Sequence, residues 1–160
     1  MNSADDCTRI HYRDLDALKA QIREEFGPWS PPVAVEQNLI GDFADMTGDH
    51  QWIHLDVERC RRESPYGRPI AHGFLVLALL PKLQMTPTFE VTGHNLMVNY
   101  GSDRLRFTGA VPAGSSIQAR SRLKAVRAVE GGTVLCFEYH IHVVGEAHPA
   151  VVYELLVRFS

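Results

Sequence analysis

The sequence is poor in features that mark several large classes of protein. Only three of its 160 residues are cysteines, and Cys7, Cys60 and Cys136 are far apart and form no Cys-x-x-Cys pair. An odd number of isolated cysteines argues against a disulfide framework and against a thiolate zinc site. It favours a reducing compartment, and we expect the cytoplasm.

Long apolar runs and a surplus of basic residues are also missing. The longest apolar run, GFLVLALL, is far shorter than the roughly 20 residues that cross a bilayer. The opening MNSADDCTRIHYRD carries acids and no apolar core, unlike a secretory signal. A net charge of −3 does not suit the displacement of counterions from a phosphate backbone. We therefore expect partners other than membranes and nucleic acids.

The composition that remains is typical of one globular domain, with 45% hydrophobic and 22% charged residues. Leu15, Leu18 and Ile22 recur at helical spacing and predict an amphipathic helix over residues 13–26, which the GPWSPP breaker ends. We interpret residues 1–32 as an N-terminal helical extension. Residues 33–160 are interpreted as a single domain.

Two more helices are predicted before residue 89. Apolar residues at helical spacing predict one over residues 35–46, with Gly48 as its C-terminal cap. Residues 73–85 are apolar on every face and predict a buried helix that Pro81 kinks or ends.

The rest of the chain has the period-two pattern of strands. Segments 117–125, 135–143 and 151–159 alternate apolar and polar residues, and a segment over residues 95–107, broken by Gly101, precedes them. We expect the four segments to form an antiparallel meander with short connections, and His140 and His142 to face solvent or a second subunit. A sheet with one apolar face and a helix apolar all round predict an α+β fold in which the sheet wraps the helix.

The stretch TGDHQWIHLD, residues 47–56, concentrates acids and histidines. His50 and His54 have the spacing that places two imidazoles on one helix face in His-Glu-x-x-His zinc sites. However, Gly48 and the β-branched Ile53 disfavour a sustained helix, the motif's glutamate is absent and no third ligand is evident. We therefore expect no metal here.

Two other interpretations of this stretch stay open. Asp49 and His54 would point about 140° apart on a regular helix, so they could converge only across an irregular turn. Such a pair could orient a water, take its proton and return a proton to a neighbouring carbon. In a purely structural interpretation, Asp49 caps the next turn, His54 donates to a backbone carbonyl, and Trp52 and Ile53 fill the core. The stretch alone favours the structural interpretation.

A second motif, GRPIAHGF, covers residues 67–74 at the start of the apolar helix. The Gly73 amide could hold a carbonyl oxygen that becomes negative, and glycine would let a ligand approach the backbone. Alternatively this is a plain helix start, with Pro69 stiffening the backbone and His72 as a cap or core residue. The residues leave both possibilities open.

The two motifs together, FADMTGDHQWIHLD and GRPIAHGF, followed by the apolar helix and the meander, resemble the MaoC-like hydratase/dehydratase family, close to its nodulation-protein-N-like subgroup. The resemblance covers residues 33–159. It implies a hot-dog fold, a curved antiparallel sheet around a central helix, assembled as a homodimer. It also implies reversible hydration of a trans-2-enoyl thioester of CoA or acyl-carrier protein to the (R)-3-hydroxyacyl form, without metal or organic cofactor.

The resemblance also implies roles for individual residues. The family's Asp-x-Asn-Pro-x-His signature falls on residues 49–54, so that Asp49 and His54 would be the catalytic pair. The Gly73 amide would be the oxyanion donor. The remaining expected substrate-binding residues are Gln51, His72 and Asn99, with Tyr100 beside the acyl chain.

The sequence departs from the family pattern at three positions. Gln51 and Trp52 replace the usual Asn and Pro, and Pro81 stands where many relatives have a hydroxyl residue. Two other functions fit the same fold: a thioesterase that hydrolyses the same substrates, and an acyl-thioester binding module without turnover.

Overall fold

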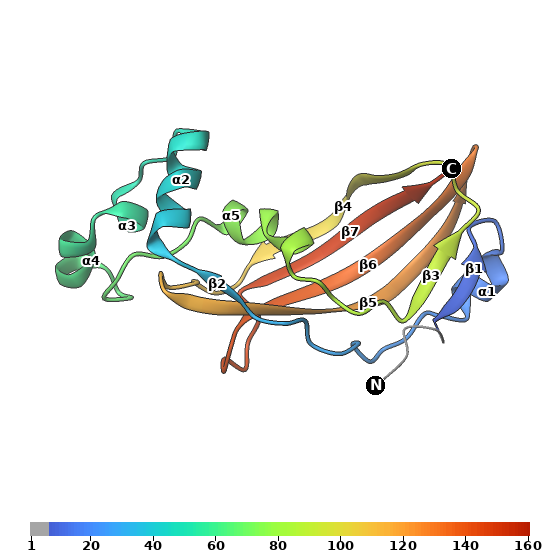
Figure 1. Cartoon of the computed structure of the whole chain (residues 1–160), viewed down its shortest axis with the longest axis horizontal. Helices are drawn as coiled ribbons and strands as arrows, with labels where there is room; N and C mark the ends of the chain where they lie inside the picture. Colours follow the sequence, from blue (N-terminus) through green and yellow to red (C-terminus); the bar gives the residue numbers. More distant parts are fainter. Residues whose placement is uncertain (1–6) are drawn as a thin grey trace.

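The computed structural model describes residues 7–160, and its main feature is a curved antiparallel sheet of five strands (Figure 1). Residues 1–6 of the expected N-terminal extension lie outside the described residues. From edge to edge, the strands are β2 (Val33–Val35), β5 (Ser115–Val129), β6 (Gly132–Val143), β7 (Val151–Phe159) and β4 (Met97–Phe107). The class is α+β, as predicted.

The meander contains three of the four expected segments. β5, β6 and β7 are neighbours in chain order, as predicted. β4 was expected beside them in chain order, but it pairs with β7 at the far edge and not with β5. The end of β4 is held beside the start of β7, because the Thr108 and Gly109 amides both donate to the carbonyl of Ala150, which directly precedes β7. The other edge of β5 is thereby left for β2.

The predicted buried face of β5 is correct up to Leu123. Ile117, Ala119 and Leu123 are buried, but a β-bulge between Leu123 and Ala125 shifts the register, and Val126 is buried in place of Ala125. A bulge adds one residue to one strand, so every later side chain changes face. Ala125 consequently packs in a small separate cluster with Cys136.

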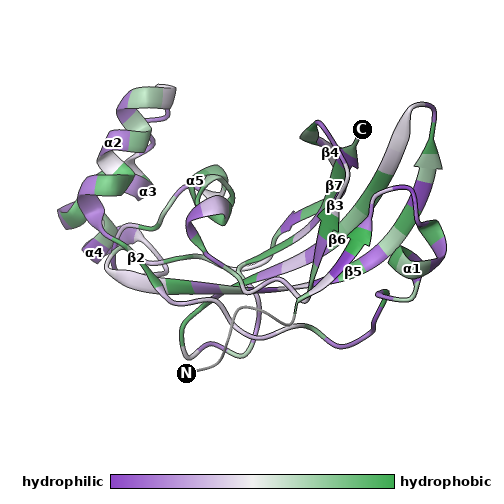
Figure 2. Ribbon diagram, turned by 45° about the vertical axis from the view of Figure 1, so that its right-hand side comes forward, coloured by the Kyte–Doolittle hydropathy of each residue, from purple (hydrophilic) through white to green (hydrophobic). Residues whose placement is uncertain are grey.

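The concave side of the sheet carries α5 (Gly73–Ala78) and the 3₁₀ turn η1 (Leu80–Lys82) (Figure 2). The helix begins at Gly73 as predicted and its regular part ends before Pro81, which lies in the 3₁₀ turn. It is not buried on every side: Leu75 and Val76 are buried, whereas Phe74 is 64% exposed. In this single chain, one apolar face of the central helix therefore stays open.

The N-terminal helix is shorter than predicted. α1 spans Leu15–Lys19, and not residues 13–26, and β1 (Thr8–His11) precedes it and pairs in parallel with β3 (Phe89–Thr92). Beyond α1 the backbone runs along the edge of β5, where Gly27 and Ser30 donate to its carbonyls. Backbone amides that donate to the edge of a strand cannot also form the hydrogen bonds of a helix. The amphipathic pattern after residue 19 therefore does not form a helix. The boundary at residues 32/33 stays a prediction.

The side chains of this edge segment cover two histidines that were expected to face solvent or a partner. Phe26 and Trp29 pack on His140 and His142, with ring centroids 4.3 and 4.9 Å apart. His142 is thereby buried by its own chain.

The remaining helices lie beyond one end of the sheet (Figure 1). They are α2 (Gln37–Thr47), α3 (Trp52–Leu55) and α4 (Val57–Glu63). The predicted helix over residues 35–46 corresponds to α2. In the part of the chain that is described, no helix has both the length and the apolar character to cross a membrane.

Candidate active site

The turn between α2 and α3 brings Asp49 and His54 of the stretch TGDHQWIHLD together. Gly48 caps α2 with φ of +78°, as predicted, a left-handed conformation that L side chains rarely adopt. The chain then reverses into the four-residue helix α3, which carries His54. Asp49 stays on the turn with its side chain 55% exposed, whereas His54 is only 8% exposed.

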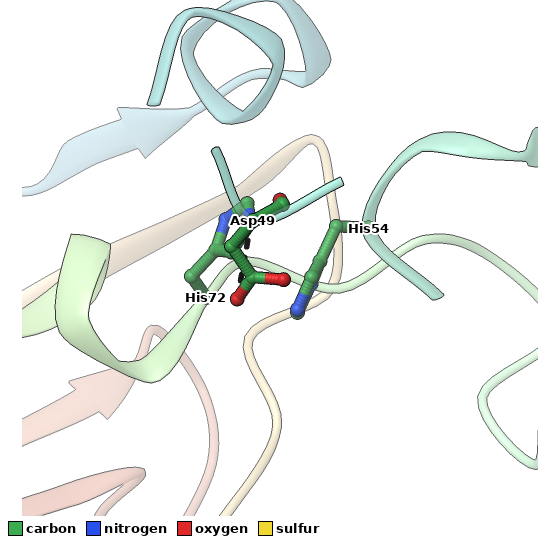
Figure 3. A group of neighbouring side chains, drawn as sticks. All are labelled: Asp49, His54 and His72. Carbon is green, nitrogen blue, oxygen red and sulfur yellow. Dashed lines mark hydrogen bonds and ion pairs between the residues drawn. The ribbon is translucent and has the colours of Figure 1, made fainter. Parts of the chain in front are cut away.

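Three side chains converge at this point (Figure 3). A carboxylate oxygen of Asp49, a ring nitrogen of His54 and a ring nitrogen of His72 all lie within 4.8 Å of one another. They come from the turn after α2, from α3 and from the N-cap of α5. The irregular turn needed to unite Asp49 and His54 is therefore present. His72, whose place was left open as cap, core or pocket, is the third member of the cluster.

The orientation of His54 is set by its Nδ1 atom. This nitrogen lies 2.7 Å from the Ile70 carbonyl, which can only accept, so Nδ1 carries the proton and Nε2 is left with a free lone pair. The Ile70 amide in turn donates to the Ile53 carbonyl at 3.1 Å. The residue before His54 thus bonds to Ile70, whose carbonyl fixes the His54 ring.

Burial lowers the pKa of His54, and the neighbouring His72 lowers it further. The bond to the Ile70 carbonyl and the charge of Asp49 act in the opposite direction and do not outweigh burial. The imidazole is therefore in its neutral, basic form at neutral pH.

Gln37 also supports His54, and no feature of the sequence indicated this. Its Nε2 atom donates to the His54 main-chain carbonyl at 2.8 Å, across 17 positions of the chain. A glutamine in the first turn of a helix has no distinctive spacing to a histidine so far away. Only the packing of α2 against α3 brings the two together.

The structural and the chemical interpretations of the stretch describe the same geometry. His54 does donate to a backbone carbonyl, but this bond uses Nδ1 and leaves Nε2 available. The Asp49 carboxylate accepts a long 3.4 Å hydrogen bond from the Gln51 amide and lies 4.0 Å from His72 Nε2, so capping does not consume it. The bond to the backbone therefore leaves the unprotonated Nε2 of His54 able to accept a proton.

His50 is not part of the cluster. It is exposed and its Nε2 atom lies 2.9 Å from Asp45 Oδ1, a hydrogen bond that raises the pKa of His50. The spacing of His50 and His54 therefore does not create a metal site. Asp49, His54 and His72 are close enough to share an ion, but His72 Nε2 already lies 2.9 Å from the Asp49 carbonyl and would have to release it.

Gly73 lies directly after His72, and within the described residues its amide has no hydrogen-bond acceptor. The reason for glycine here differs from the expected one. A Cβ atom at this position would lie 2.8 Å from the ring of Phe107. The Phe107 ring therefore occupies the space beside Gly73, which is not open to a ligand. The free amide, but not the missing side chain, remains available to a substrate.

The other expected binding residues are more scattered. Gln51 is exposed, and its side chain has no hydrogen bond to any described residue. Asn99 lies on β4 in the wall of a cavity. Tyr100, expected beside it, lines a different hollow with Val129 and Arg158, because neighbouring residues on a strand point to opposite faces.

The cavity has a volume of about 760 Å³ and lies between η1, β3 and the concave face of the sheet. Most of its walls are apolar; two tyrosines, Tyr139 and Tyr153, lie among them, and burial raises the pKa of Tyr139 to about 12. Leu77, one helical turn after Gly73, belongs to the wall. Pro81, in the 3₁₀ turn after α5, lies in the same wall, and the non-helical residues 83–88 that follow also line the cavity.

Comparison with known proteins gives a consistent family. The model of the MaoC like domain matches residues 20–142. The 3-hydroxyacyl-thioester dehydratase Z of Mycobacterium tuberculosis (strain ATCC 25618 / H37Rv) is 45% identical over 149 residues, which are 92% of this chain and 97% of that protein. Nodulation protein N of Rhizobium leguminosarum bv. viciae is 35% identical over 144 residues, 89% of this chain and 88% of that protein.

A solved structure gives the same result for the fold. The (R)-hydratase from A. caviae involved in PHA biosynthesis superposes with a TM-score of 0.66 at 24% identity, over 85% of this chain and 97% of that one. At this identity the likeness concerns the fold alone.

Proposed function

The chain belongs to the family of MaoC-like domains, and from this premise we propose that it interconverts a 2-enoyl thioester and the (R)-3-hydroxyacyl thioester. The fold is the hot-dog fold that the resemblance implied, and the chain is a hydratase/dehydratase enzyme like its relatives. The thioester carrier is CoA or acyl-carrier protein.

One observation carries the assignment of roles: the Asp49 carboxylate and a ring nitrogen of His54 lie within 4.8 Å, and the free Nε2 of His54 is a base. Hydrogen bonds to oxygen measure about 2.7–3.0 Å, so one water can contact both groups at once. We assign Asp49 and His54 to hold this water.

In the hydration direction, His54 Nε2 takes a proton from the water while the water oxygen forms a bond to C3 of the enoyl thioester. The electron pair of the C2–C3 double bond moves to the thioester carbonyl, and the Gly73 amide stabilises the resulting enolate oxygen. Collapse of the enolate forms a C–H bond at C2 with the proton returned by the Asp49/His54 pair. Water is added, no other reactant is consumed, and the same steps in reverse remove it.

The cavity behind α5 suits the acyl chain of the substrate. Its apolar wall includes Leu77, one turn from Gly73, followed by Ala78 and Pro81. We assign Asn99 to the same wall. The apolar lining excludes a strongly polar acyl group, because burying polar groups without partners is unfavourable.

The reaction as written needs no metal and no organic cofactor. Water supplies both new substituents, and the thioester itself stabilises the carbanion as an enolate. His54 and Asp49 provide the proton transfers.

We also propose that two copies of the chain assemble as a homodimer. β4 is an edge strand, and it and the residue before it expose large apolar side chains, a combination that favours pairing with another chain: Leu96, Met97, Val98, Tyr100 and Phe107. The exposed Phe74 of α5 packs against Phe107 and extends this surface toward Gly73.

The deciding experiment is a hydration assay on crotonyl-CoA and longer trans-2-enoyl-CoAs. We expect loss of the enoyl absorbance, formation of the (R)-3-hydroxyacyl product and no free thiol. Release of CoA thiol would show a thioesterase instead, and tight binding without any product would show a binding module. Light scattering on the same sample measures the oligomeric state.

A further inference from the structure

His72 is the most buried member of the cluster in Figure 3, at 4% exposure. Its ring stacks on His54, with centroids 3.7 Å apart and planes 28° from parallel, and Phe43 packs against it at 5.1 Å. Two aromatic neighbours therefore enclose the imidazole. A ring so enclosed is poorly placed to contact substrate directly.

The two ring nitrogens of His72 differ in their hydrogen bonding. Its Nε2 lies 2.9 Å from the main-chain oxygen of Asp49, and because a carbonyl only accepts, Nε2 carries the proton. The other nitrogen, Nδ1, is buried and has no partner among the described residues. The structure therefore requires the Nε2–H tautomer.

This bond is the short contact that holds the Asp49 turn to the rest of the molecule. The other hydrogen bonds of Asp49, with Thr47 Oγ1 and with the Gln51 amide, are local and measure 3.4 Å. The bond from His72 spans 23 positions of the chain. Among the residues that the structure describes, the remaining hydrogen bonds of Asp49 join it to its own neighbours.

The backbone around His72 is itself firmly held. The Ile70 amide donates to Ile53 at 3.1 Å, the Ala71 amide donates to Val111 at 2.8 Å, and the His72 carbonyl accepts from Val76 within α5. One short segment is thus tied to α3, to the strand connection after β4 and to the central helix. It is a rigid support for whatever the His72 ring contacts.

We propose that His72 is a positioning residue for the water-handling pair, holding the Asp49 main chain with Nε2–H and the His54 imidazole with its ring face. It sets the separation of carboxylate and imidazole from the rigid start of α5. This inference rests on the proposed function and replaces the expectation that His72 binds substrate.

The contribution follows from geometry. A pair that shares one water works only while both groups stay within hydrogen-bonding distance of it, so a shift of about 1 Å costs up to 10²-fold in rate. The ring of His72 also lowers the pKa of His54. The groups that act on the charge of His54 are His72, from the start of α5, and Asp49, on the turn after α2.

Two substitutions separate the contacts. In His72→Phe the ring face against His54 is kept and the donor is lost. In His72→Gln the ring is lost, but the side-chain amide nitrogen can still reach the Asp49 carbonyl. His148→Phe, on the exposed turn between β6 and β7, is the matched control.

For His72→Phe we expect kcat on an enoyl-CoA to fall at least thirtyfold while KM changes less than threefold. His72→Gln should recover kcat to within about fivefold of the wild type. A His72→Phe variant that keeps wild-type kcat, or a His72→Gln variant as inactive as the Phe variant, would overturn the proposal.

A two-bond ¹H–¹⁵N spectrum of the histidine rings in the wild-type protein gives a readout that needs no activity. We expect His72 as the Nε2–H tautomer and His54 as the Nδ1–H tautomer. Another tautomer at His72 would refute the inference even if the variants fail to fold. If the wild type hydrates no enoyl thioester, the proposed function fails while the spectrum still decides the geometry.

Discussion

His50 Nε2 lies 2.9 Å from Asp45 Oδ1, so that an exposed Asp–His pair stands next to the partly buried pair of Asp49 and His54. The two pairs have the same residue types and differ in surroundings. In the inner pair the histidine is buried and its pKa lies below the ordinary value, whereas the hydrogen bond to Asp45 raises the pKa of the exposed His50.

The two pairs provide a matched test of the catalytic roles. Asp49→Asn and His54→Ala should each lower kcat/KM by about 10²- to 10⁴-fold, because each removes one partner of the water. Asp45→Asn and His50→Ala should leave it within about twofold. Circular dichroism checks folding. Near-normal activity of the two inner variants would refute the assignment.

The pH dependence of the wild type reports the state of His54. Its pKa lies below the ordinary value, chiefly through burial, so the basic form persists to lower pH than in a free imidazole. We expect kcat/KM to be flat at neutral pH and to fall with one proton below about pH 6.5. A limb above that value would mean that another group, or a charged His54, governs the reaction.

Removal of metal ions should leave the enzyme active. Because His72 Nε2 is occupied by the Asp49 carbonyl, the cluster offers two free ligands and not three. After dialysis against EDTA, we expect kcat within about twofold of the untreated sample. A loss greater than tenfold that added Zn²⁺ restores would show that the cluster holds a metal.

The size of the cavity should control chain-length preference. Ala78→Phe places a ring in its wall. Displacing two methylene groups of the acyl chain costs about 1.6 kcal/mol, so the kcat/KM ratio of decenoyl-CoA to crotonyl-CoA should fall at least tenfold. The control is Ala147→Phe on an exposed turn. An unchanged ratio in the Ala78 variant would place the acyl chain elsewhere.

The ion pair of Arg122 and Glu138 should contribute to stability. Burial raises the pKa of Glu138, but hydrogen bonds from Arg122 and His140 outweigh it and bring the value below normal. Arg122→Met removes the arginine from this buried carboxylate and should lower the free energy of unfolding by about 3 kcal/mol at pH 7, measured in urea. Arg61→Met, which removes an exposed pair with Glu58, should cost under about 1 kcal/mol.

The same experiment has a defined pH dependence. Since the pKa of Glu138 is lower in the folded protein, its stabilisation is complete above the unfolded value of about 4.3 and is lost as the pH falls through the folded value. The difference between wild type and Arg122→Met should therefore shrink in acid. A difference that grows would contradict the assignment.

Local patterns in the sequence determined much of the fold. Helical spacing and a glycine cap predicted α2, period-two alternation predicted the three strands of the meander, and Gly73 marked the start of the central helix. These features depend on residues close together in the chain. The amphipathic pattern over residues 13–26 failed because the backbone there bonds to the distant edge of β5.

The site divides in the same way. The two motifs and their resemblance to a family predicted the roles of Asp49, His54 and Gly73, which stay predictions until the variants are measured. Tertiary structure alone decided that the Ile70 carbonyl orients His54, and that His72 holds the Asp49 turn. It also decided that β4 lies beside β7. The physical reason is that these contacts join residues many positions apart, whose meeting depends on how helices and strands pack and not on any pattern along the chain.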